Sequence, residues 1–108
     1  MKTYEIMEIE TAKRFDMVNV THMVERKLAD LGFEQGIVVV YCPHTTGAIT
    51  INEGADPDVQ DDIQRFNAKL VPQNWGFKHV EGNSDSHIKT SCFGASETII
   101  VDGGRLVL

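Results

Sequence analysis

The chain has 108 residues, which is enough for one domain and not for two. Its 42% hydrophobic and 24% charged residues are typical of an ordinary globular protein with a small core. A formal net charge of −6 argues against a nucleic-acid surface, because such a surface needs clustered lysine and arginine. The sequence has no apolar run of about 18 residues, so we expect no membrane-spanning helix.

The two cysteines, Cys42 and Cys92, stand apart without a CxxC spacing. We therefore expect two free, buried thiols in a reducing compartment. The N-terminal residues carry acids where a signal peptide would carry an apolar block. The expected location is the cytoplasm.

The first third of the chain predicts a strand, a helix and a second strand. Residues 2–9, KTYEIMEI, alternate apolar and polar side chains imperfectly and predict a half-buried strand. Residues 18–32 predict a helix that ends at Gly32, with His22 on its solvent side. One side of this helix carries Val20, Val24, Lys27, Leu28 and Leu31. The β-branched run at 36–42, GIVVVYC, predicts a strand buried on both faces.

The rest of the chain predicts a short strand, two helices and a hairpin. Residues 47–53, GAITINE, form the strand, which PHTT connects to the run before it. Asp56 and Pro57 open a helix as N-cap and first residue. Its predicted buried stripe is Val59, Ile63, Phe66 and Leu70. A short helix follows, capped by Asn83 or Ser84 and ended by Gly94, and the sequence Asp102-Gly103-Gly104 predicts the hairpin turn. Closely spaced strand pairs favour an α+β fold with a mixed or mainly antiparallel sheet and packed helices over a doubly wound fold.

Three histidines lie in polar settings at the edges of these elements, namely His44, His79 and His87. Three neutral imidazoles with one open position are a common arrangement for catalytic zinc. His79 lies in a predicted loop and His87 near the start of the predicted helix, so both side chains can face the same point. His44 would have to arrive from the strand pair, which the spacing does not establish. Separate histidines bonded to backbone groups are the alternative.

The predicted helix start near Asn83 offers a second kind of chemistry. Its free N–H groups, beside Gly82, suit an anion such as phosphate, and His87 in the first turn is favoured in its neutral form. The basic residues that could assist are Lys78, Lys89 and Arg105. Glu53, next to Asn52, could act as a general base or orient a histidine, although an acidic turn is the simpler interpretation.

Several motifs together resemble one known family. These are PHTTGAITINEGADPDVQDDI, then the histidines of FKHVEGNSDSHIKTSCFG, then VDGGRLVL. They are similar to the YjbQ family, small proteins often called secondary thiamine-phosphate synthases. The resemblance runs through nearly the whole chain, which we therefore expect to form one YjbQ-like domain over residues 1–108.

The resemblance implies a β-sandwich of jelly-roll-like character with packed helices, assembled as a homotrimer. It also implies a pocket near subunit contacts for a divalent metal, zinc or magnesium, or for an anion. The family's shared polar residues correspond here to His44, Thr45, Thr46, Asn52, Glu53, His79, Gly82, Asn83 and His87. In this assignment His44, His79 and His87 are the metal ligands, and Glu53, His87 and Asn52 are catalytic. Thr45, Thr46, Gly82, Asn83 and Lys89 bind a small phosphorylated substrate.

The chain departs from the family pattern after GRLVL. Family members continue with a segment like GTWQGIYFCEFDGPR, which supplies another strand, and an edge without that strand would be exposed. The implied activity joins a pyrimidine pyrophosphate to a thiazole phosphate. A metal-dependent hydrolase of a small substrate, with Glu53 as base, is the alternative, and a non-catalytic trimer that binds a metal or an anion is a third hypothesis.

Overall fold

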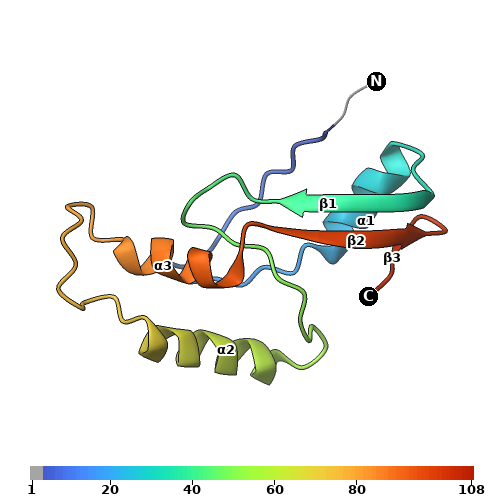
Figure 1. Ribbon diagram of the computed structural model, residues 1–108. Coiled ribbons are helices and arrows are strands. Elements are labelled where there is room, and N and C mark those ends of the chain that lie inside the picture. The colour runs from blue at the N-terminus through green and yellow to red at the C-terminus, as the bar shows by residue number, and fades with distance from the viewer. Residues whose placement is uncertain (1–3) are drawn as a thin grey trace. The chain divides into compact units, whose positions relative to one another are not determined.

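The computed structural model describes residues 4–108, which fold into two compact units. Unit 1 contains residues 4–38 together with Ile99–Leu108, and unit 2 contains Val39–Thr98. The order of elements is helix, strand, two helices and two strands (Figure 1). No helix in residues 4–108 has both the length and the apolar character needed to cross a membrane.

Helix α1, Thr21–Asp30, confirms the first predicted helix. Val24 and Leu28 are each 5% exposed, as the apolar stripe predicts. The helix ends in a Schellman motif, because Gly32 donates to the carbonyl of Ala29 and Phe33 donates to that of Leu28. Gly32 has φ of +65°, the left-handed conformation expected of a glycine after a helix.

The sheet has three strands in the order β1-β2-β3 and is antiparallel. Its strands are β1 (Gln35–Tyr41), β2 (Ser96–Asp102) and β3 (Arg105–Leu106). Asp102 pairs with Arg105, and both intervening glycines have positive φ, which confirms the predicted hairpin (Figure 1). Ile99 and Val101 of β2 are buried, at 7% and 1% exposed.

A carboxylate ties α1 to the β2–β3 hairpin within unit 1. Glu25 Oε2 accepts from Arg105 Nε at 2.8 Å and from the Leu106 N–H at 3.0 Å. These bonds, the side-chain one above all, lower the pKa of Glu25 below its ordinary value of 4.5. His22, on the solvent side of α1 as predicted, has its Nδ1 3.7 Å from the other oxygen of Glu25.

The two helices of unit 2 begin and end where the sequence predicts. Helix α2, Pro57–Leu70, has Asp56 as N-cap, and the Asp56 side chain accepts from the N–H of Asp58. Helix α3, Ser84–Phe93, has Asn83 as N-cap and Gly94 after its last turn. On α2, the side chains of Asp61 and Asp62 are exposed, and Arg65 of the same helix contacts both carboxylates.

Two predicted strands are wrong. Residues 4–9, the described part of the segment 2–9, form no strand, and Tyr4 and Ile6 are 74% and 72% exposed. Residues 47–53 also form no strand, although the N–H of Ile49 donates to the carbonyl of Gly94. A strand is stabilised by its ladder partner, and neither segment has one within residues 4–108.

Three predictions of burial are wrong as well. Strand β1 buries neither face fully, because Ile37, Val39 and Tyr41 on one face are 59–64% exposed, and Val38 and Val40 on the other face are only half-buried. The stripe of α2 is not buried either, with Phe66 and Leu70 more than half exposed. The cysteines are free as expected, but Cys42 is half-buried and Cys92 exposed. Periodicity identified these apolar faces correctly, but burial requires a covering element, which residues 4–108 do not provide.

Candidate functional site

A tight turn carries the first group of predicted site residues. The carbonyl of His44 accepts from the N–H of Gly47 at 3.1 Å, which leaves Thr45 and Thr46 at the two central positions. All three of these polar side chains are exposed. A Cβ at Gly47 would lie 2.5 Å from Cys42 Sγ, so only glycine lets the turn lie this close to Cys42. The turn therefore presents one imidazole and two hydroxyls to solvent.

Asn52 and Glu53 lie in the loop before α2, and both side chains bond locally. Asn52 Oδ1 accepts from the Glu53 N–H at 2.7 Å. Glu53 Oε1 accepts from the N–H groups of Ala55 and Asp56, at 2.8 Å and 3.3 Å. The Glu53 carboxylate therefore shapes the turn that leads into α2, and a role as base would have to coexist with these bonds.

The structure brings His79 and His87 together. Their ring centroids lie 5.6 Å apart, with the rings nearly perpendicular at 84°. His87 lies in the first turn of α3, and His79 precedes a turn closed by the bond from the Gly82 N–H to the His79 carbonyl. Gly82 has φ of +76°, which a side-chain-bearing residue rarely adopts, and this turn carries the chain from His79 into α3. His79 Nε2 also lies 3.9 Å from a carboxylate oxygen of Glu81.

The start of α3 contains buried polar atoms next to this histidine pair. Asn83 Oδ1 is buried, forms no capping bond and has no hydrogen-bond partner within residues 4–108. The carbonyl of Asn83 accepts from the N–H groups of Ser86 and His87. Because Ser86 and His87 already donate within the helix, the N–H of Ser84 is the donor that this turn can offer to an external acceptor.

The predicted substrate residue Lys89 lies beside a carboxylate. Its ammonium is 3.5 Å from Asp85 Oδ2, with the Lys89 side chain 15% exposed and that of Asp85 fully buried. Asp85 was missed among the predicted site residues, although its position four residues before Lys89 is the helix spacing at which acid and base meet. Because Asp85 balances its charge, Lys89 is not an isolated cation available to a substrate.

Within residues 4–108, no three His, Cys, Asp or Glu side chains are grouped so that they could hold a metal ion. The structure therefore supplies two neighbouring imidazoles, His79 and His87, but does not assemble the three-histidine ligand set with His44. A zinc or magnesium ion would need a further ligand from elsewhere, and metal binding itself stays a prediction.

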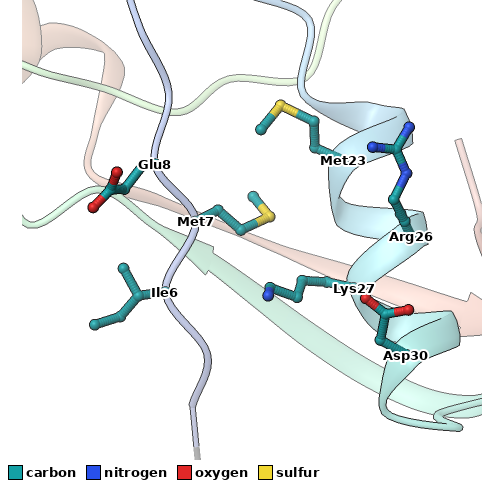
Figure 2. Close-up of a pocket in the computed structure, with 7 residues that line it drawn as sticks. All are labelled: Ile6, Met7, Glu8, Met23, Arg26, Lys27 and Asp30. Carbon is teal, nitrogen blue, oxygen red and sulfur yellow. The ribbon is translucent and has the colours of Figure 1, made fainter.

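A groove in unit 1 lies outside the predicted site. Its volume is about 240 Å³, and it runs between residues 6–8 and α1 (Figure 2). Met7 from the segment and Met23 and Lys27 from α1 line it. The sequence places Lys27 on the apolar side of the helix but gives no sign of a role for it.

Comparison with known proteins gives one consistent result. The family model described as "UPF0047 protein YjbQ-like" matches residues 5–108. The UPF0047 protein MJ1081 of Methanocaldococcus jannaschii is 48% identical over 101 residues, which cover 94% of this chain and 73% of that protein. The UPF0047 protein YugU of Bacillus subtilis is 45% identical over 103 residues, covering 94% and 78%.

Solved structures agree with the sequence comparison. An uncharacterized protein of the yjbq/upf0047 family from Clostridium acetobutylicum superposes with a TM-score of 0.88 at 44% identity, covering 93% of this chain and 78% of that one. The hypothetical protein APE1520 of Aeropyrum pernix superposes with a TM-score of 0.85 at 38% identity, covering 93% and 75%. These similarities extend over both units.

Proposed function

Because this chain belongs to the UPF0047 YjbQ-like family, we propose that it has thiamine-phosphate synthase activity at the His79–His87 pair. The observation that carries the proposal is the meeting of these two imidazoles, one of them in the first turn of α3. The substrates are a pyrimidine that bears a pyrophosphate on its methylene carbon and a thiazole phosphate.

The reaction is a displacement that exchanges one bond for another. The thiazole nitrogen donates its lone pair to the methylene carbon, and the bond from that carbon to oxygen breaks. Pyrophosphate leaves with the bonding pair, so nothing is oxidised or reduced. The step needs no base, which fits a Glu53 carboxylate already bonded to the backbone N–H groups of Ala55 and Asp56.

The protein must stabilise the negative charge that grows on the leaving pyrophosphate. Imidazole N–H groups of His79 and His87 and the N–H of Ser84, the first residue of α3, are the donors we assign to it. Lys89, paired with Asp85, contributes by holding the first turn of α3 in place. Thr45, Thr46 and Asn52 are assigned to orienting the two rings, since effective catalysis requires the nitrogen and the carbon to be aligned.

The activity is tested by measuring thiamine phosphate formed from the two precursors. We expect His87→Gln and His79→Gln to lower kcat/KM about 100-fold, as loss of a leaving-group donor does elsewhere. His22→Gln is the matched control, because His22 is 87% exposed on α1 and belongs to unit 1. Product at the no-protein level, or equal rates for the wild type and His87→Gln, would refute the proposal.

A metal-dependent hydrolase is the second candidate, favoured by the same two adjacent imidazoles. It requires a metal that residues 4–108 do not fully ligate, so we derive no step through it. Elemental analysis of untagged protein and the change in melting temperature on adding Zn²⁺ test this candidate. Absence of metal together with an unchanged melting temperature would eliminate it. Intact protein that is inactive in both assays would favour a non-catalytic binding role.

We also propose the finer features that the resemblance implies, a jelly-roll-like sandwich and a homotrimer. The exposed apolar residues of β1 and α2 support a further covering layer or partner. Two free thiols fit a reducing compartment such as the cytoplasm. Sedimentation equilibrium tests the trimer, and a monomer at micromolar concentration would contradict it.

A further inference from the structure

The groove of unit 1 contains apolar side chains and the ammonium of Lys27, which lies on the apolar side of α1. Lys27 shares the side of α1 that carries Val24 and Leu28, both 5% exposed, and is itself half-buried. An ammonium in such a position normally reaches water or a carboxylate partner. No carboxylate of residues 4–108 forms an ion pair with it. The ammonium is thus available to an external anion.

The side chains around Lys27 define what else such a ligand would contact. Figure 2 draws Met7 on the α1 side of its segment, and Lys27 extending from α1 toward that segment. Met23 lies one turn earlier on the helix. Thioether side chains are flexible and polarizable, and they adapt to irregular apolar ligands. The groove therefore offers two thioether side chains with a cation beside them.

The net charge and the volume of the groove limit the ligand further. Arg26 and Lys27 are balanced by Glu8 and Asp30 along the lining, so the groove has no net positive charge that would favour a doubly charged anion such as phosphate. The volume of the groove is about 240 Å³. This is smaller than the ~300–1,000 Å³ typical of drug-sized ligands.

From these observations we propose that the groove between residues 6–8 and α1 binds a small alkyl carboxylate. The carboxylate accepts from the Lys27 ammonium, and the alkyl chain lies against Met7 and Met23. Neither the assigned activity nor the His79–His87 pair involves these residues, so the two proposals stand or fall separately.

Ligand binding in the groove can be measured through the NMR signals of the methionine methyl groups. In protein labelled with ¹³C at the methionine methyl groups, titration with hexanoate is expected to shift Met7 and Met23. Met17, also in unit 1 but outside the lining, serves as the internal reference. We expect a dissociation constant on the order of 1 mM, given a ligand of about eight non-hydrogen atoms.

Variants test the role assigned to the ammonium. Lys27→Gln is expected to weaken hexanoate binding about tenfold, which is a typical contribution of a charge-assisted hydrogen bond. Lys27→Arg should keep the affinity, and Lys13→Gln, at an exposed position, should leave it unchanged. Hexanol, which lacks the carboxylate, should bind about tenfold more weakly than hexanoate.

Four results would overturn the proposal. Two concern the methyl signals: no shift of Met7 and Met23 at tens of millimolar hexanoate, or an equal shift of Met17. The other two concern affinity: the Lys27→Gln variant binds hexanoate as tightly as the wild type does, or the wild type binds hexanol as tightly as hexanoate. Shifts of Met7 and Met23 that change with protein concentration alone would assign the groove to contact with a second copy instead.

Discussion

The ion pair between Asp85 and Lys89 allows the sharpest test of how unit 2 is stabilised. Lys89→Met removes the ammonium and leaves a fully buried carboxylate beside an apolar side chain. At 3.5 Å and an effective dielectric constant near 20, the attraction between the two charges is about 5 kcal/mol. Measured losses on breaking buried pairs are about 3–5 kcal/mol. We expect a similar loss in the free energy of unfolding.

A double-mutant cycle separates the pair from its surroundings. Asp85→Asn should cost less than Lys89→Met, because the Lys89 side chain is 15% exposed and its ammonium can turn toward water. The double variant should recover about 2–3 kcal/mol relative to the sum of the two single losses. Urea unfolding followed by circular dichroism gives all four free energies.

The chain contains a matched control pair for this cycle. Asp61 and Arg65 on α2 have the same spacing and lie 2.9 Å apart, but both side chains are about two-thirds exposed. Their coupling should be only about 0.3–0.5 kcal/mol, because water screens exposed charges. A coupling between Asp85 and Lys89 as small as that of the control would refute the argument from burial.

Three further predictions concern single contacts. Because the folded-state pKa of Glu25 lies below 4.5, its bonds contribute fully above that pH and are lost as the pH falls through the lowered value. Glu25→Gln should therefore flatten the decline of the urea midpoint below pH 4.5. Asp56→Ala should cost about 1 kcal/mol in thermal unfolding by removing the N-cap of α2, whereas Asp58→Ala should cost less. Gly47→Ala should cost about 1–3 kcal/mol through its clash with Cys42 Sγ, and Cys42→Ala in the same chain should restore part of that loss.

The helices and the hairpin could be predicted because their signals are local. Asp56 and Pro57 fix the start of α2, Gly32 and Gly94 mark two helix ends, and the two glycines after Asp102 determine the turn. Each signal acts through hydrogen bonds or dihedral angles within a few residues. Long-range structure does not alter such a signal, so the predicted start of α2, the glycines that end α1 and α3, and the hairpin turn agree with the structure. The start of α1 carries no such signal, and the helix predicted from residue 18 begins at Thr21.

Each failed prediction of a strand or of a buried face concerns a segment whose structure depends on a second segment packed or paired against it. Residues 4–9 and 47–53 have strand-like sequences, but a strand needs a ladder neighbour that periodicity does not identify. The same limit applies to β1 and α2, whose apolar faces were recognised while their exposure was not. At the candidate site, the sequence spacing of His79 and His87 indicated that their side chains can meet, and the two rings do lie together. The role expected of Lys89 as a cation for the substrate did not include Asp85, the acid four residues before it, which balances its charge.

The bond between Glu25 and the hairpin bears on how the chain is synthesised. Unit 1 joins residues 4–38 to Ile99–Leu108, and Glu25 contacts Arg105, 80 positions later. Helix α1 therefore leaves the ribosome long before the strands that complete its unit, with the apolar side chains of Val24 and Leu28 uncovered. Val39–Thr98 is continuous in sequence and emerges whole in between. Translation thus favours early folding of unit 2, with unit 1 closing last, and α1 is the part of the nascent chain most exposed to chaperones and to aggregation.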